Sequence, residues 1–93
     1  MVIAVVSWEL HLPAAHSLKE KRSVLSRLKA RLRNEFNVSV AETGLHDIWQ
    51  RGEITAALVA GDRRHADALL AAVERTVDDA PDCRVIDRVR TFY

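Results

Sequence analysis

The sequence predicts an α+β domain whose elements follow the order β-α-β-β-α-β. Two observations predict this class. Four segments have the composition of strands, and two amphipathic helical segments each separate one strand from the next. A helix that joins two parallel strands of one sheet makes a right-handed crossover, which leaves few topologies for this order. The split βαβ arrangement is one of them, with two helices on one face of a four-stranded antiparallel sheet. We therefore expect a ferredoxin-like sandwich.

The first strand and the first helix have the clearest signals. Residues 2–12 alternate with period two, and Pro13 ends the strand because proline cannot donate to a ladder. The helix begins after Ser17, where Ser17 and Glu20 fit a capping box, and we expect it to end near Glu35. The strand's inward face is Val2, Ala4, Val6, Trp8, Leu10 and Leu12, and the helix's apolar face is Leu18, Val24, Leu25, Leu28 and Leu32.

The remaining elements follow from similar patterns. Residues 36–42 alternate as a second strand, residues 43–50 form a loop, and residues 54–60 alternate as a third strand. Asp62 is a suitable N-cap for a second amphipathic helix that ends near Val77. A turn over residues 78–82 leads to a last strand over residues 85–93, whose inward face the pattern does not identify.

Length and composition are those of one soluble domain, residues 1–93. The chain is 48% hydrophobic and 29% charged, and no apolar run approaches the roughly 20 residues that span a bilayer. The apolar residues 2–6 have no positive region before them, which favours a strand over a signal peptide. The single cysteine, Cys83, excludes an internal disulfide and suits a reducing compartment. We therefore expect a cytoplasmic protein that makes no membrane contact.

An uneven distribution of charge is the main functional signal. Residues 1–33 contain seven Lys and Arg against two acids (+5), whereas residues 34–93 contain seven against eleven (−4). The excess lies on the first helix, in Lys19, Lys21, Arg22, Arg27, Lys29, Arg31 and Arg33. Such a helix gains from counterion release when it neutralises phosphates, and arginine pairs bidentately with phosphate oxygens. We predict that these seven side chains bind RNA, the alternative being a solvated helix face.

The uncovered face of the sheet is a second candidate site. Open apolar faces of this kind often bind a partner. Trp49, just before the third strand, either anchors a partner or closes one end of the core. The alternative function is therefore a protein-interaction or homodimerisation module that uses Ile3, Val5, Ala57, Val59 and Trp49. We do not expect bases to stack on the sheet as in the RNA-recognition motif, because the third strand has no aromatic residue and Trp8 has core parity.

The sequence contains no recognisable catalytic, metal or cofactor site, and no small-molecule substrate is predicted. Its four histidines, His11, His16, His46 and His65, do not have the spacing of metal ligands. Cys83 lies near Asp79 and Asp82, whose negative charges raise a thiol pKa, and we expect it to be structural. The remaining alternative is that the protein is a small enzyme whose active site contains His46 and Asp47.

Four stretches resemble the YlxP-like family of small bacterial proteins: residues 16–22 (HSLKEKR), 37–42 (NVSVAE), 49–51 (WQR) and 62–65 (DRRH). The resemblance covers nearly the whole chain and implies a ferredoxin-like fold of unknown function. Genes of that family often lie near those for translation initiation and ribosome maturation, which implies ribosomal RNA or a ribosome-associated protein as partner. It prescribes no catalytic residue. The chain departs from the family in its last strand, where Arg84, Arg88 and Arg90 either extend the basic surface or face solvent.

Overall fold

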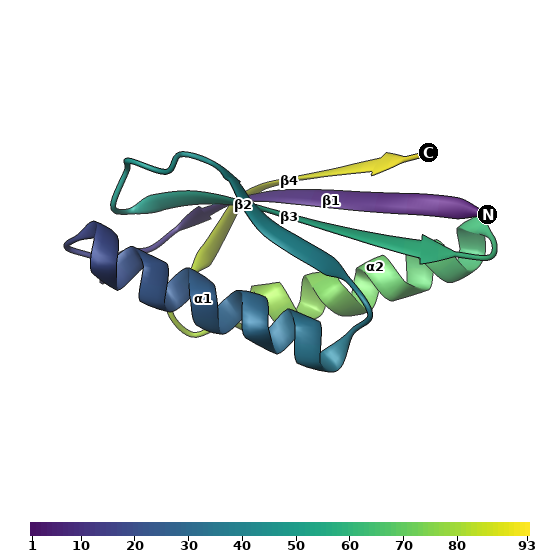
Figure 1. Ribbon diagram of the computed structural model, residues 1–93, viewed down its shortest axis with the longest axis horizontal. Helices are drawn as coiled ribbons and strands as arrows, with labels where there is room; N and C mark the ends of the chain where they lie inside the picture. The colour runs from purple at the N-terminus through teal and green to yellow at the C-terminus, as the bar shows by residue number, and fades with distance from the viewer.

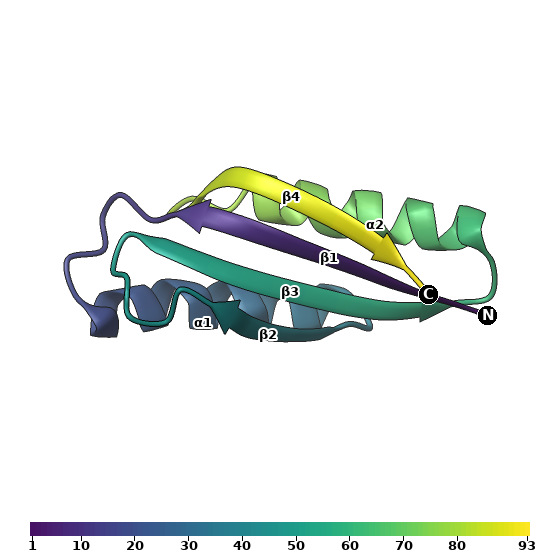
Figure 2. The ribbon, with the colours of Figure 1, turned by 90° about the horizontal axis from the view of Figure 1, so that it is seen from above.

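The computed structural model describes all residues, 1–93, and has the predicted element order (Figure 1). The elements are β1 (Val2–His11), α1 (Leu18–Glu35), β2 (Ser39–Gly44), β3 (Arg51–Ala60), α2 (Arg63–Asp78) and β4 (Arg84–Phe92). The four strands form one antiparallel sheet in the order β2-β3-β1-β4. Both helices lie on the same face of this sheet, and no element covers the other face (Figures 1 and 2). The prediction of a ferredoxin-like α+β fold is confirmed.

The two central strands are long, and the edge strand β2 is short. β1 and β3 pair over their whole length, from Val2 opposite Ala60 to His11 opposite Arg51. β2 begins three residues later than predicted. Phe36 is the C-cap of α1, and the residues that follow it connect the helix layer to the sheet before pairing begins at Ser39. β3 begins three residues earlier than predicted. Gly52 occupies an inward position, but it has no side chain, so the alternating apolar pattern in the sequence did not extend to it.

Gly52 is glycine for a steric reason. A Cβ at this position would lie 3.3 Å from Leu25 Cδ1 and 3.5 Å from Lys21 Cε, both on α1. The absence of a side chain therefore lets the N-terminal half of α1 pack closely against the start of β3. This close approach brings Lys21 beneath the loop that joins β2 to β3.

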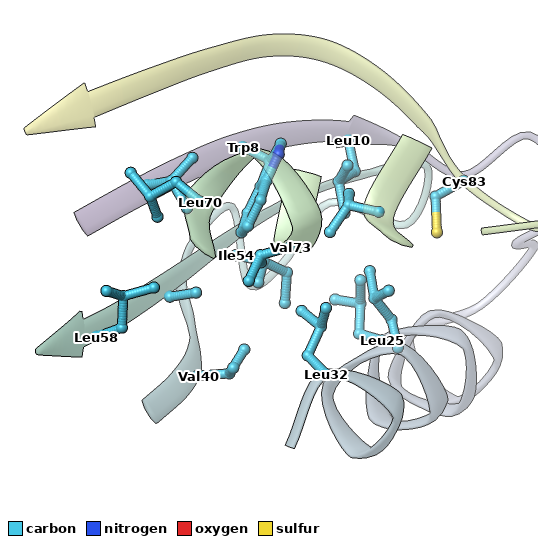
Figure 3. Close-up of a cluster of buried hydrophobic side chains, with 14 of the residues drawn as sticks. Trp8, Leu10, Leu25, Leu32, Val40, Ile54, Leu58, Leu70, Val73 and Cys83 are labelled. Carbon is cyan, nitrogen blue, oxygen red and sulfur yellow. The ribbon is translucent and has the colours of Figure 1, made fainter. Parts of the chain in front are cut away.

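The core lies between the sheet and the helices, and Trp8 is its largest side chain (Figure 3). Trp8 is 0% exposed, as its predicted inward parity requires, and it lies among Leu10, Ile54 and Leu70. Its indole Nε1 is buried without a hydrogen-bond acceptor. The inward positions of β1 from Ala4 to Leu10 are all buried, as is Leu12 just after the strand, which confirms the predicted face over these residues.

The inward face of β4 is set by its register with β1. Arg88 lies opposite Trp8 and Arg90 opposite Val6, so both arginines are on the helix side of the sheet. There they converge on Glu74 of α2, which is 4% exposed: Arg90 Nε donates to Glu74 Oε2 at 2.8 Å, and Arg88 Nε lies 3.3 Å from the same oxygen. The hydrogen bond to Glu74 raises the pKa of Arg90 further. Both arginines are therefore paired with a buried carboxylate of α2 and do not extend the basic surface of α1.

Replacing Glu74 by Gln is expected to lower the free energy of unfolding by about 1–3 kcal/mol, because two guanidinium groups lose a buried charged acceptor. Urea denaturation followed by circular dichroism measures this loss. Asp78→Asn is the matched control, since Asp78 pairs with Arg88 only at the surface, at 3.7 Å. Surface pairs contribute about 0–1 kcal/mol, so equal losses in the two variants contradict the assignment of Glu74 as the buried partner of both arginines.

Cys83, in the turn before β4, is buried and titrates abnormally. Burial, followed by the negative charge of Asp82, raises the pKa of the thiol from 9.0 to about 11, and Arg27 offsets part of this rise. Burial is therefore the main cause, ahead of the nearby acid named from the sequence. Because the thiol ionises more readily in the unfolded chain, its contribution to stability is complete below pH 9 and is lost as the pH rises towards 11.

We therefore expect the stability difference between the wild-type protein and Cys83→Ala to shrink above pH 9. The difference should fall by about 1.4 kcal/mol per pH unit, the free energy that corresponds to one pKa unit. Chemical denaturation of both proteins at a series of pH values measures it. A difference that stays constant from neutral to alkaline pH contradicts a buried, hard-to-ionise thiol.

Candidate functional site

Helix α1 begins where the sequence predicts. The Ser17 hydroxyl accepts from the backbone N–H of Glu20 at 3.1 Å, and the Glu20 carboxylate accepts from the backbone N–H of His16 at 2.8 Å. The reciprocal half of the capping box thus uses His16 rather than Ser17 itself. The helix then runs along the edge of the molecule below β2 and β3 (Figures 1 and 2). Its sheet-facing residues are Lys21, Leu25, Leu28 and Leu32.

Lys21 does not belong to an exposed phosphate-binding set, which corrects its assignment from the sequence. Its side chain is 1% exposed. Lys21 Nζ donates to the backbone carbonyl of Leu45 at 2.5 Å and lies 3.3 Å from Glu42 Oε2. The physical reason is helical spacing, since Lys21 precedes Leu25 by four residues and shares its buried face. That spacing is visible in the sequence, but the prediction grouped Lys21 with the other cations by its charge and did not use its position on the helix.

Arg27 and Arg31 lie on the flank of α1 that faces the turn before β4, and both are paired with acids. Arg27 Nη2 is 3.3 Å from Asp82 Oδ2, and Arg31 Nε is 3.0 Å from Glu35 Oε1, four residues along the same helix. Both side chains are exposed, so these pairs are weak in energy. Each acid nevertheless offsets one positive charge on this flank.

The other four cations share the opposite flank, next to the edge strand β2. Lys19, Arg22, Lys29 and Arg33 have no acidic partner. At 3.6 residues per turn they fall within an arc of about 80°, and at 1.5 Å per residue they extend over about 21 Å. We call these four residues the basic stripe. Arg33 Nη2 donates to the backbone carbonyl of Val40 at 2.6 Å, which fixes the C-terminal end of the stripe against β2.

The loop over residues 45–50, between β2 and β3, lies beside the first turns of α1 in both views of the ribbon (Figures 1 and 2). Lys21 joins the two segments directly through the Leu45 carbonyl. Trp49 is 53% exposed and Ile48 is also exposed, so Trp49 does not close the core as one sequence interpretation proposed. The loop instead presents an apolar, aromatic surface near the N-terminal end of the basic stripe.

The open face of the sheet gathers four of the five residues of the second candidate site. Ile3 lies opposite Val59 and Val5 opposite Ala57, and Val59 is 65% exposed. Trp49 is not part of this cluster, because it precedes the first residue of β3, whereas Ala57 and Val59 lie near the last. Sequence reasoning missed further exposed apolar residues of β4 and the C-terminus, among them Val89 and Tyr93, because the sequence pattern did not identify the inward face of that strand.

Polar groups occupy the part of the open face between the apolar cluster and Trp49. The Thr55 hydroxyl is 2.8 Å from the hydroxyls of both Ser7 and Thr43, and Arg51 Nε donates to Glu9 Oε2 at 2.9 Å. These side chains satisfy one another across three strands. The apolar cluster and the loop therefore form two separate surfaces.

Comparison with known proteins places the chain in a family. Residues 3–90 match the family model described as "Protein of unknown function (DUF503)". The chain is also 42% identical over 79 residues to "Uncharacterized protein YlxP" of Bacillus subtilis (strain 168), which covers 84% of this chain and 86% of that protein. Neither helix has the length and apolar character needed to cross a membrane. The match extends from β1 into β4, and the chain therefore belongs to the DUF503 family, to which the YlxP-like resemblance of its sequence pointed.

Proposed function

We propose that this protein binds RNA through the basic stripe of α1 and acts as a non-enzymatic accessory factor. The observation that carries the proposal is the separation of charges on α1. Four cations without acidic partners share one flank, while Arg27 and Arg31 on the other flank are paired. We place the RNA in translation or small-subunit maturation, the setting that the family resemblance implies, which makes ribosomal RNA the first ligand to test.

The geometry of the stripe suits a phosphate backbone. A helix holds its side chains at fixed intervals, so four cations over about 21 Å can neutralise several successive phosphates. Each neutralised phosphate releases condensed counterions, which is the main source of affinity for such a surface. Arg22 and Arg33 add planar groups that bind two phosphate oxygens at once, while Lys19 and Lys29 act as point charges. Contacts of this type position an RNA without reading its sequence.

The experiment is a fluorescence-anisotropy titration of a structured ribosomal RNA fragment with two double variants. Arg22→Ala/Lys29→Ala removes two charges from the stripe. Arg27→Ala/Arg31→Ala removes the same net charge from the opposite flank of the same helix and serves as the matched control. We expect the first to weaken binding by about tenfold or more and the second by about twofold or less. If the two double variants weaken RNA binding equally, affinity depends only on net charge, and this result contradicts the basic stripe as the binding site.

The open face of the sheet supports a second proposal, self-association. Val59, Val89 and Tyr93 are exposed on the face of the sheet that no helix covers, and Ile3 and Val5 lie on the same face. A second copy that packs on this face removes these side chains from water, which is the usual fate of such a cluster. Sedimentation equilibrium tests the proposal: a dimer that Val5→Glu disrupts supports it, and a wild-type monomer at tens of micromolar contradicts it. The dimer leaves the basic stripe free, because the stripe lies on the helix layer.

A further inference from the structure

The loop over residues 45–50 is held in place by a buried charge. Removing an ammonium group from water costs several kcal/mol, and Lys21 is 1% exposed. The fold offsets this cost with the Glu42 carboxylate at 3.3 Å and the Leu45 carbonyl at 2.5 Å. The backbone of Leu45 has φ 58°, a left-handed conformation that residues other than glycine rarely adopt. A costly buried group and a strained residue thus fix the first residue of one surface loop.

What this loop presents is a tryptophan with more than half of its surface in water. The core has its own tryptophan, Trp8, and does not need Trp49. The loop is joined to α1 at Lys21, and two members of the basic stripe, Lys19 and Arg22, lie within two residues of Lys21 in the chain. The loop and the first turns of α1 lie at the same end of the molecule (Figures 1 and 2). The loop carries the exposed ring of Trp49, and the first turns carry two cations without acidic partners.

We propose that Trp49 stacks on an unpaired base of the RNA whose phosphates lie along the basic stripe. The inference rests on the proposed function and names its ligand class, an RNA that is single-stranded where it passes the loop. Proteins that bind single strands combine a row of cations along the backbone with aromatic rings on which bases stack, because every base has a flat π face. A base inside a duplex cannot offer that face. Asp47 is the one acidic residue of the loop, and its repulsion of phosphate favours contact through the base at this point.

The two tryptophans make the test direct. Trp8 is 0% exposed and Trp49 is 53% exposed, so a stacked base quenches the Trp49 part of the emission and leaves the Trp8 part unchanged. The wild-type protein is titrated at low salt with a single-stranded oligouridylate and oligoadenylate, and with a duplex of equal length. We expect both single strands to quench the emission and to bind more tightly than the duplex. In Trp49→Ala the affinity for single strands should fall by about tenfold, the effect of losing one stacked base, and in Trp49→Phe by less.

Ile48→Ala is the control variant, because Ile48 is an exposed apolar neighbour without an aromatic ring. It should change the affinity by about twofold or less, since no base stacks on it. If Arg22→Ala/Lys29→Ala weakens binding while Trp49→Ala does not, and no quenching occurs, the stacking role is overturned and the stripe stands. If neither RNA form binds at low salt, the proposed function fails as well. Duplex binding as tight as single-strand binding also overturns the inference and leaves Trp49 as an anchor for a protein.

Discussion

Replacing Lys21 by methionine is expected to lower the free energy of unfolding by about 3–5 kcal/mol, the range found when one member of a buried ion pair is removed. Methionine keeps most of the aliphatic volume against Leu25 and Gly52, so the loss arises from charge and hydrogen bonding. Glu42 keeps a buried carboxylate oxygen that has no hydrogen-bond partner and loses its ion pair, and the Leu45 carbonyl loses its donor from Lys21. Urea denaturation followed by circular dichroism measures the change.

The double variant Lys21→Met/Glu42→Gln tests whether the loss of stability arises from the interaction between Lys21 and Glu42. Glutamine carries no charge, so most of the stability lost in Lys21→Met should return when Glu42 is also changed. If the double variant is as unstable as the sum of the two single variants, Lys21 and Glu42 act independently. That result contradicts the assignment of Lys21 as the residue that supports the loop through its pair with Glu42.

Trp8→Ala is expected to lower the free energy of unfolding by about 3–5 kcal/mol, because it opens a cavity at the centre of the sheet–helix interface. Trp8→Phe should cost much less. The indole Nε1 is buried without an acceptor, and removing an unsatisfied donor returns about 1–3 kcal/mol that offsets part of the lost packing. Thermal unfolding of the two variants tests this difference. Both variants lack the indole N–H, so the difference between them reports the size of the cavity. A loss of about 3 kcal/mol or more in Trp8→Phe, with no gain to offset the lost packing, contradicts an unsatisfied N–H.

The arrangement of elements was predictable because local signals and global topology agree. Ser17 and Asp62 cap the helices as the sequence indicates, with Oγ and Oδ1 accepting from the third residue that follows each. The period-two alternation of β1 is confirmed at every inward position from Ala4 onward. These signals act within a few residues of chain, which is the range over which a single sequence is informative.

The last strand was not predictable because its inward side chains are charged. Arg88 and Arg90 occupy positions that normally carry apolar residues, and they are stabilised there by Glu74, which lies on another element. No spacing in the sequence relates β4 to α2. The same limit applies to Trp49, whose exposure depends on the loop conformation that Lys21 holds from α1.

The presence of seven cations on α1 was predictable from the sequence, whereas the surroundings of each cation were not. Seven cations on one helix pointed to α1, but a count of charges cannot say which of them face acids. The fold assigns Lys21 to the interior and pairs Arg27 with Asp82 from the turn before β4. The four cations of the basic stripe differ from the others only in their position around the helix axis. That position became meaningful once the neighbours of each flank were known.

The most direct test of RNA binding by the basic stripe is the salt dependence of the affinity for a single-stranded RNA. Each phosphate contact contributes a slope of about −0.7 to the plot of log affinity against log salt, so four contacts predict a slope of about −3. Arg22→Ala/Lys29→Ala should reduce the steepness by about half, and Arg27→Ala/Arg31→Ala should leave it unchanged. A wild-type slope near zero, or a slope that the stripe variant does not alter, contradicts RNA binding through the basic stripe.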